Sequence, residues 1–271
     1  MIDLIDITNS TFNYNFHSHT QFCDGRDVME QFVLHAINDG IEHYGFSPHG
    51  PIPISPCCNM KRESVSLYLA EVKRLKELYG DKINLYASME IDYINDDVNP
   101  ASDYYQNLPL DYRIGSVHYI QSQDGIYVDI DGKFERFKDS MERFFHNDID
   151  YVINQFYASS VKMVETGGFD IVGHLDKIGQ NASYFHPGIE DTASYHQKVM
   201  DLLDLISSKN LVIEINTKAL ANHGRVFPNA RYFSRVKELK IPVVINSDTH
   251  YPDKIQAGRY ETKSLYDSVI V

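Results

Sequence analysis

The chain has 271 residues, of which 43% are hydrophobic and 23% are charged, so its composition is that of an ordinary globular protein and excludes the disordered and fibrous classes. A formal net charge of -13 excludes a protein that binds duplex nucleic acid, because such a protein presents a basic surface to the phosphates. The length suits a single α/β domain, and we expect one domain over residues 1–271.

The sequence gives no sign of a membrane segment. No apolar run approaches the roughly 20 residues that span a bilayer, and residues 1–13 carry acidic and amide side chains where a signal peptide is basic and then apolar. The cysteines, Cys23, Cys57 and Cys58, form an odd set that fits a reducing compartment. We therefore expect a cytoplasmic protein, and the sequence leaves open whether it forms a homo-oligomer.

The N-terminal half of the sequence predicts strands that alternate with helices. Short apolar runs indicate the strands, and apolar residues at helical spacing indicate the helices. Asp27 is expected to cap the first helix. The expected strands cover residues 12–16, 41–47, 82–89 and 112–117, the expected helices cover residues 27–38 and 64–79, and an irregular loop covers residues 51–61.

The C-terminal half continues the same alternation. The expected strands cover residues 169–173 and 211–215 and begin again at residue 241, the expected helices cover residues 134–145, 150–165, 192–208 and 229–239, and a loop is expected over residues 177–191. Seven short buried strands joined by helices predict parallel strands with helical crossovers. The fold class is therefore α/β, with the strands closing into a barrel.

Two pairs of potential metal ligands lie at strand ends, one near each end of the chain. His17 and His19 follow the first strand, and Asp248 and His250 follow the last. Side chains two residues apart point to the same face of an extended strand, so each pair can bind one site. If the first and last strands are neighbours in a closed barrel, the two pairs meet.

Most of the other predicted strands also lead into a side chain that can bind metal. A single His or Asp in a loop is more often a turn former or a surface residue, but coincidence explains poorly a set that falls on one rim of a barrel. The predicted metal ligands are His17, His19, Asp24, His49, Glu90, His118, His174, Asp248 and His250.

The ligand types indicate the chemistry. Imidazoles and carboxylates suit Zn, Fe or Mn, and nine ligands are too many for one ion, so two or three ions are expected. Glu90 and Asp248 are the expected catalytic carboxylates, because they can bridge neighbouring ions. Such ions lower the pKa of water to about 7, and hydrolysis of a phosphoester is the reaction that this arrangement favours.

The sixth predicted strand leads into no metal ligand, but cations lie nearby. Its outgoing loop carries Lys218 and Arg225, and Lys177 lies three residues after His174. The fork of a guanidinium suits phosphate oxygens, so we favour Arg225 as a substrate-binding residue over an exposed surface arginine. For Lys177, substrate binding and a surface position stay equally open.

Several short motifs together resemble those of the polymerase and histidinol phosphatase (PHP) superfamily, and most of all its histidinol-phosphate phosphatase branch. The resemblance spans nearly the whole chain. The motifs are H-x-H-T at His17 to Thr20, D-G at Asp24 and Gly25, G-F-S-P-H-G-P at Gly45 to Pro51, M-E-I-D-Y at Met89 to Tyr93, G-S-V-H-Y at Gly115 to Tyr119, G-H-L-D at Gly173 to Asp176 and S-D-T-H at Ser247 to His250.

The resemblance implies a distorted (β/α)7 barrel of the TIM type with three divalent metal ions. It implies hydrolysis of L-histidinol phosphate to L-histidinol and phosphate, a step of histidine biosynthesis, on a small phosphomonoester substrate. The ligand sets that it implies are His17, His19, Glu90 and Asp248 for one ion, Glu90, His118 and His174 for a second, and Asp24, His49 and His250 for a third.

Two departures from the branch leave alternatives open. Members often carry an arginine shortly after the G-H-L-D motif, where this chain has Lys177. The E-I-N-T segment of this chain, Glu214 to Thr217, is followed by Lys218, and its arginine is delayed to Arg225. A PHP enzyme acting on another small phosphoester is the first alternative. A metal-binding module without catalysis is the second, and the retention of every predicted ligand counts against it.

Overall fold

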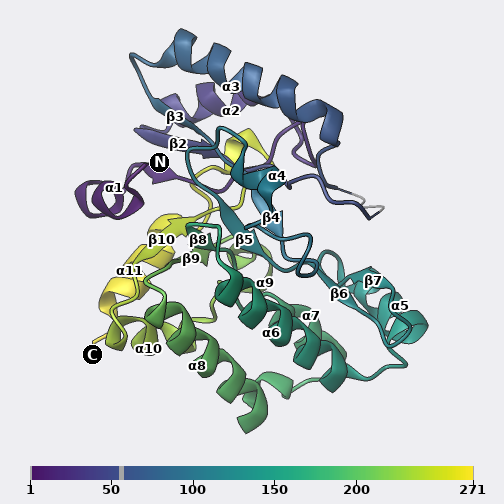
Figure 1. The fold of residues 1–271 in the computed structure, drawn as a ribbon. Coiled ribbons are helices and arrows are strands. Elements are labelled where there is room, and N and C mark those ends of the chain that lie inside the picture. The colour runs from purple at the N-terminus through teal and green to yellow at the C-terminus, as the bar shows by residue number, and fades with distance from the viewer. Residues whose placement is uncertain (1, 55–57, 271) are drawn as a thin grey trace.

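The computed structural model describes residues 2–54 and 58–270, so Cys57 and part of the loop expected over residues 51–61 lie outside the described residues. Short strands form the centre of the molecule and helices surround them (Figure 1). The strands of the first sheet, in the order β1-β2-β3, are Tyr14–Asn15, His43–Phe46 and Asn84–Ala87. Those of the second sheet, in the order β10-β9-β8-β5-β4, are Val243–Asn246, Val212–Asn216, Ile171–Val172, Ile114–Ser116 and Glu90–Asp92.

The two sheets together form a distorted barrel. Every strand pair within them is parallel, and isolated parallel bridges link the sheets, one from Ser18 to Thr249 and one from His49 to Glu90. The hydrogen bonding around the ring is therefore interrupted. The fold class predicted from the sequence, α/β with parallel strands inside outer helices, is confirmed.

The third predicted strand is divided in two. β3 ends at Ala87, and the chain enters the second sheet as β4 at Glu90. The hydroxyl of Tyr68 lies 3.0 Å from the carbonyl oxygen of Phe46 and 2.7 Å from that of Ser88, and so fills the place where the strands part. Glu90 is thus the first residue of a strand and not the residue after one.

The predicted helices are present with small shifts at their ends. Asp27 does not cap the first of them, because Val28 occupies the N-cap position and the Asp27 carboxylate accepts only the N–H of Val28. Within the described residues no helix is long and apolar enough to cross a membrane. These helices are α2 Met29–Asn38, α3 Val65–Tyr79, α5 Phe134–Phe144, α6 Ile149–Thr166, α8 Ala193–Ser208 and α10 Phe233–Glu238.

Several elements were not predicted. The loop expected over residues 177–191 contains helix α7, Ile178–Phe185, and an antiparallel hairpin follows β5. The hairpin and α5 lie together at one side of the molecule (Figure 1), and Asp131, which follows the hairpin, forms an ion pair with Lys177 after β8. The other unpredicted elements are α1 Leu4–Ser10, α4 Asp103–Gln106, the hairpin strands β6 Tyr119–Gln121 and β7 Tyr127–Asp129, α9 Leu220–His223 and α11 Arg259–Ser268.

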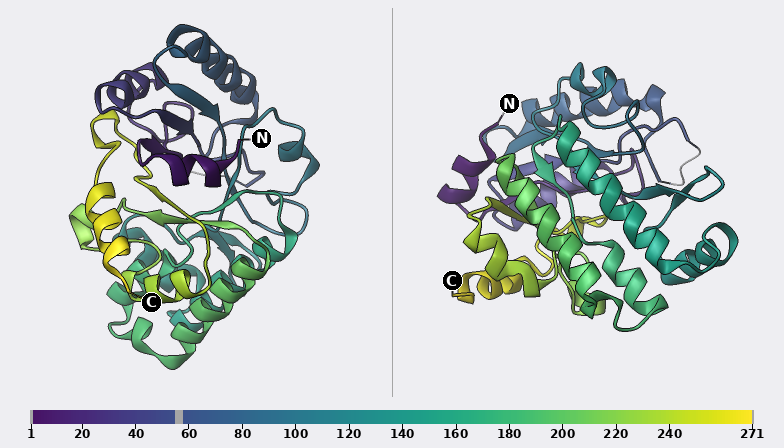
Figure 2. Two further views of the ribbon diagram at one scale, coloured as in Figure 1. Left: turned by 90° about the vertical axis from the view of Figure 1, so that its left-hand side faces the viewer. Right: turned by 60° about the horizontal axis from the view of Figure 1, so that its bottom comes forward.

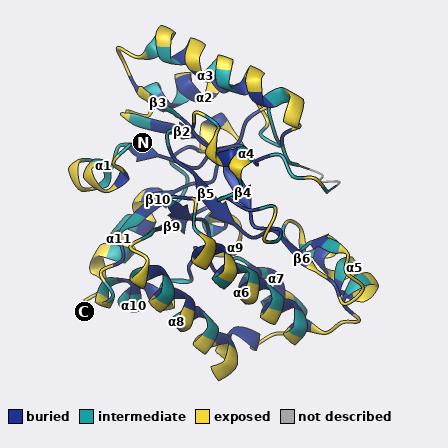
Figure 3. Cartoon of the chain, viewed as in Figure 1, coloured by how far each residue is buried: buried dark blue, intermediate teal, exposed yellow. Residues whose placement is uncertain are grey.

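The interior of the barrel changes from apolar to polar along the strands. Phe16, Ile114, Ile171 and Val244 are buried together inside the ring, and α2 and α3 cover one sheet while α6, α7 and α8 cover the other. Burying an aliphatic or aromatic side chain of this size contributes about 1.5–3 kcal/mol. At the carboxyl ends of the strands many of the buried side chains are polar, and the central strands are mostly buried (Figure 3).

Candidate metal centre

The structure brings all nine predicted metal ligands together at the carboxyl ends of the barrel strands. Most are buried, and only Asp24 and His250 are partly accessible. Because parallel strands end at one rim, residues far apart in the chain meet there. His17 and His19 follow β1, Asp24 lies in the next turn, His49 follows β2, Glu90 opens β4, His118 follows β5, His174 follows β8, and Asp248 and His250 follow β10.

Glu90 lies at the centre of the cluster and faces two sides. Its Oε1 atom lies 2.8 Å from Nε2 of His174 and 3.4 Å from Nε2 of His118. Its Oε2 atom lies 3.0 Å from Nδ1 of His49 and 3.3 Å from Nε2 of His17. A carboxylate divided in this way is suited to bridge two cations.

Asp248 is the second carboxylate of the cluster that contacts several charged groups. Its Oδ1 atom lies 3.1 Å from Nε2 of His19 and 3.2 Å from Nζ of Lys218. Its backbone is left-handed, with φ of 48°, a conformation that Asp tolerates better than most residues and that costs free energy. The last strand therefore turns sharply after Asn246 to direct this carboxylate into the cluster.

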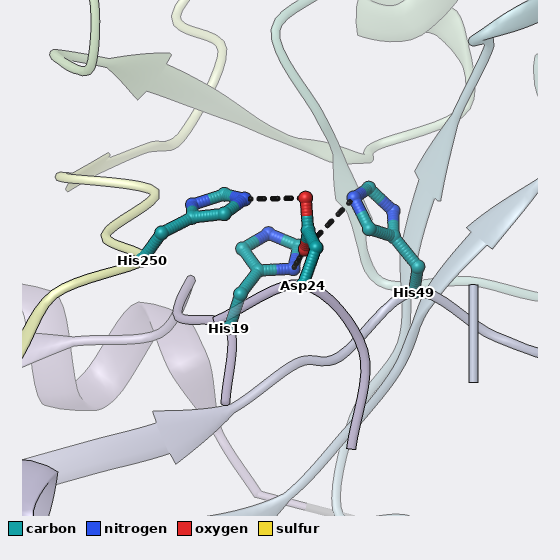
Figure 4. Close-up of side chains that lie close together, drawn as sticks. All are labelled: His19, Asp24, His49 and His250. Carbon is teal, nitrogen blue, oxygen red and sulfur yellow. Dashed lines mark ion pairs between the residues drawn. The ribbon is translucent and has the colours of Figure 1, made fainter. Parts of the chain in front are cut away.

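Asp24 forms a third group with three histidines (Figure 4). Its Oδ2 atom lies 3.2 Å from Nε2 of His250, and its Oδ1 atom lies 3.7 Å from Nδ1 of His19 and 3.9 Å from Nε2 of His49. Gly25 permits this turn, because a Cβ there would lie 2.3 Å from the carbonyl oxygen of His19. The turn thus holds Asp24 close to the residues that follow the first strand.

The donor set fits divalent cations. Nε2 of His17, Nε2 of His19, Nδ1 of His49 and Oδ1 of Asp24 are buried without a hydrogen-bond partner. Buried polar atoms are normally hydrogen-bonded, so four unpaired ones at one place indicate that these atoms serve as metal ligands. The groups whose ligand atoms lie within 4.8 Å of one another are His19, Asp24, His49 and His250; His17, His19 and Asp248; His49, Asp92 and His118; and Glu90, His118 and His174.

Charges within the cluster hold its carboxylates ionised. Burial alone would raise the pKa of Glu90, but the charges of His118 and His17 outweigh it and hold that pKa well below its usual value. Burial is outweighed in the same way at Asp248, whose pKa is lowered chiefly by Lys218. Both side chains are therefore in the form that binds metal at neutral pH.

Two carboxylates that the sequence analysis missed orient the histidines. Oε1 of Glu214 lies 2.6 Å from Nδ1 of His17, and Oδ1 of Asp92 lies 2.8 Å from Nδ1 of His118. In metal sites, such contacts fix which ring nitrogen faces the ion. The signals in the sequence were a second acidic residue two positions after Glu90, in E-I-D at Glu90 to Asp92, and an acidic residue inside an otherwise apolar run, in V-I-E-I at Val212 to Ile215.

The cations near the cluster differ in how they are held. Nζ of Lys177 lies 2.7 Å from Oδ2 of Asp131, and Lys218 lies against Asp248 as described above. The guanidinium of Arg225 instead forms two hydrogen bonds to Glu190, of 2.6 and 2.7 Å. Arg225 lines a pocket of about 330 Å³ among whose described lining residues none is a predicted metal ligand. The structure therefore pairs Lys218 directly with a carboxylate of the cluster, and it places Lys177 where burial is outweighed by the charges of Asp131, Asp248 and Glu90, which raise the pKa of its ammonium group.

Comparisons with known sequences identify relatives of the chain. A family model described as PHP domain matches residues 15–218. A protein of Bacillus subtilis named histidinol-phosphatase is 27% identical over 252 residues, which make up 86% of this chain and 92% of that protein.

Solved structures of similar fold come from two further bacteria. A Listeria monocytogenes protein, proposed to be a histidinol phosphatase, aligns with a TM-score of 0.80 and 21% identity, over 92% of this chain and 99% of that one. A histidinol phosphate phosphatase of Lactococcus lactis, crystallised with zinc, L-histidinol and phosphate, aligns with a TM-score of 0.70 and 18% identity, over 94% of this chain and 92% of that one. At these identities the likeness establishes the fold.

Proposed function

Because the chain belongs to the PHP domain family, we propose that it is a metal-dependent phosphomonoesterase that hydrolyses L-histidinol phosphate to L-histidinol and phosphate. The observation that carries the proposal is the convergence of nine imidazole and carboxylate side chains at one rim of the barrel. The Bacillus subtilis relative named histidinol-phosphatase, which aligns over most of both chains, supports this choice of substrate. We treat residues 1–271 as one domain, since residues near both ends of the chain supply the cluster.

We assign three divalent ions to the cluster. Zinc is the first ion to test, because the Lactococcus lactis protein was crystallised with it, and Fe and Mn suit the same donors. Ions at these groups would act as Lewis acids, lowering the pKa of water to about 7 and offsetting charge on the phosphoryl oxygens. The residues proposed to hold them are His17, His19, Glu90 and Asp248; Glu90, His118 and His174; and Asp24, His49 and His250.

The protein's own side chains divide the remaining work. Glu90 and Asp248 hold the ligand groups at fixed separations, because each contacts histidines from different strands. Lys177 and Lys218 place ammonium groups at the same rim, where they attract and orient the phosphate of the substrate. The burial of this end of the barrel keeps bulk water away and strengthens these interactions.

Arg225 is the third proposed substrate-binding cation, and it can bind only after it separates from its present partner. Its guanidinium must leave Glu190, to which both Nη atoms are bound, before it can bind a phosphate. The partner of Lys218 is Asp248, which belongs to the cluster, so Lys218 can bind a phosphate there without leaving a distant partner. We therefore expect Lys218 to contribute more to substrate binding than Arg225.

The experiment that tests the function is phosphate release from a panel of esters. Protein loaded with zinc, and separately with manganese or iron(II), is assayed on L-histidinol phosphate, on a sugar phosphate, on a nucleoside monophosphate and on phosphotyrosine. We expect kcat/KM for L-histidinol phosphate to exceed the others by at least about tenfold, a difference of about 1.4 kcal/mol in the activation free energy. Metal content per chain is measured on the same samples.

The other outcomes separate the alternatives. Equal rates on all esters would contradict the proposed substrate and leave a phosphoesterase of broader or different specificity. Full metal content without turnover of any ester would contradict catalysis and support a metal-binding module.

A further inference from the structure

Glu214 is a fully buried carboxylate in the middle of β9, the strand that leads into no predicted metal ligand. Its Oε1 atom lies 2.6 Å from Nδ1 of His17 and 3.1 Å from the amide nitrogen of Asn246. Its Oε2 atom lies 2.9 Å from the amide nitrogen of Asn216 and 3.1 Å from the backbone nitrogen of His174. A buried charge is tolerated only when it is fully hydrogen-bonded, and this one has two partners on each oxygen.

The orientation of both amides is fixed independently of Glu214. The side-chain oxygen of Asn246 accepts the backbone N–H of Phe16, and the side-chain oxygen of Asn216 accepts the backbone N–H of Lys218. Their NH₂ groups must therefore face Glu214. Since the third partner is a backbone N–H, Glu214 is an acceptor toward all three and has no use for a proton of its own.

This arrangement determines the tautomer of His17. An acceptor-only carboxylate at 2.6 Å requires that Nδ1 of His17 carries the hydrogen. The other ring nitrogen, Nε2, is then free of hydrogen in the neutral ring and faces Glu90 and Asp248, where it is buried without a hydrogen-bond partner. When the ring is neutral, which is the form that binds metal, Nε2 is therefore the nitrogen that faces the cluster.

Glu214 also connects three parts of the rim. It binds the ring that follows β1 and the backbone of His174 after β8. The amide of Asn216, which donates to Glu214, lies 3.1 Å from Oδ2 of Asp248 after β10. The single carboxylate therefore lies beneath ligands from three strands.

We infer that Glu214 is a positioning residue that fixes the tautomer and the ring orientation of His17 and thereby sets the affinity of the cluster for divalent cations. The inference deepens the proposed function and rests on its metal site, and it gives a role to β9, which leads into no proposed ligand. Glu214 touches neither the substrate nor the ion in this role; it acts through His17.

The main test is the variant Glu214→Gln, studied by zinc binding and by NMR. The glutamine has the same size, but its NH₂ group must face N–H donors on one side or the other. If the NH₂ group faces His17, the ring hydrogen of His17 would move to Nε2. If it faces Asn216 and His174, the two donors on that side would repel it and the strand ends would move apart. We expect zinc affinity, measured by competition with a chromophoric chelator, to fall by about 10–100-fold.

The matched control is Asp170→Asn, which also converts a carboxylate to an amide. Asp170 precedes β8 at the other end of the barrel and accepts the backbone N–H of Arg113. This variant is expected to bind zinc as the unmodified protein does. An equal loss in both variants, or an unchanged affinity in Glu214→Gln, would overturn the inference.

A second measurement needs no variant and decides the question if Glu214→Gln does not fold. In zinc-loaded unmodified protein, ¹H–¹⁵N spectra are expected to show a hydrogen on Nδ1 of His17 that resonates far downfield and exchanges slowly with water, as a short hydrogen bond to a buried carboxylate requires. An Nδ1 without hydrogen, or an Nδ1 hydrogen that exchanges as fast as that of an exposed histidine, would overturn the inference.

The two proposals can fail separately. Loss of zinc affinity in Glu214→Gln, with no turnover of L-histidinol phosphate by the unmodified protein, would retain the positioning role and reject the proposed function. Turnover by the unmodified protein with unchanged zinc affinity in the variant would do the reverse.

Discussion

The Nε2 atom of His19 lies 3.1 Å from Oδ1 of Asp248, although the two residues follow the first and the last strands of the barrel. The contact depends on the junction of these strands, where Ser18 and Thr249 form a parallel bridge and the backbone N–H of His19 donates to the carbonyl oxygen of Thr249 at 2.8 Å. The bridge that joins the two sheets at this point therefore also brings the ligand pairs of the first and last strands together.

Removal of metal is expected to abolish hydrolysis reversibly. Chelation leaves the buried ring nitrogens without partners and the carboxylates without cations, so both activity and thermal stability should fall. Restoring zinc, manganese or iron(II) should recover both. Activity and Tm are measured before chelation, after it and after reloading, and activity that survives complete metal loss would contradict the proposal.

Glu90→Gln should be the most damaging of the conservative substitutions. It removes the charge that lies between two histidine groups, and we expect kcat to fall by about 10³-fold, equivalent to about 4 kcal/mol, together with a loss of bound metal. Steady-state kinetics and metal analysis check this. The control Glu77→Gln changes an exposed residue of α3 and should behave as the unmodified protein does.

Asp92→Asn should weaken metal binding without removing a proposed ligand. Oδ1 of Asp92 accepts hydrogen bonds from Nδ1 and from the backbone N–H of His118, and Oδ2 accepts one from the side-chain amide of Asn59. An asparagine can serve only one of these sides as an acceptor, so we expect metal affinity to fall by about tenfold. Competition with a chelator measures the change, and Asp39→Asn, at an exposed site after α2, should leave the affinity unchanged.

Lys218→Met should separate substrate binding from metal binding. Loss of a charged hydrogen bond to phosphate costs about 1.5–3 kcal/mol, so kcat/KM should fall by about 10–100-fold. Metal content should be undiminished, because the ammonium lies 3.2 Å from Oδ1 of Asp248 and repels cations there. A variant that loses metal and activity in parallel would show that Lys218 has a structural role instead. Lys73→Met, at an exposed position of α3, is the control.

Arg225→Met is expected to affect stability more than catalysis. It leaves the buried carboxylate of Glu190 without its bidentate partner, which should lower the free energy of unfolding by about 3 kcal/mol. Urea unfolding measures the loss, and the double variant with Glu190→Gln should regain much of it. A large fall in kcat/KM in protein that is fully folded would instead support a direct contact between Arg225 and the phosphate.

The sequence predicted the parts of the cluster that depend on strand period and strand ends. His17 and His19, and Asp248 and His250, are spaced so that each pair faces one way, and this local rule needs no knowledge of the rest of the fold. Parallel strands then bring all such ends to one rim. The nine side chains could therefore be predicted to meet before any distance was known.

The remaining features depend on contacts between distant segments. Arg225 was favoured for its fork-shaped guanidinium, but the sequence does not reveal that Glu190 binds it. Glu214 was overlooked because a single acidic residue in an apolar strand acquires meaning only when its partners are known. The sequence predicts a loop where helix α7 lies because the segment is rich in Gly, Asn, Ser and Pro, although Ile178, Ala182 and Phe185 lie at helical spacing and pack into the core.

The junction of Ser18 with Thr249 has a consequence for how the protein matures. The ribosome makes the strand that leads into Asp248 and His250 long after the strand that leads into His17 and His19, so for most of its synthesis a nascent chain holds the first pair of proposed ligands without the last pair. Of the three proposed ion groups, the two that include Asp248 or His250 are thus completed only when translation is nearly finished, and a chain that stops short of its last strand lacks both of these groups in complete form.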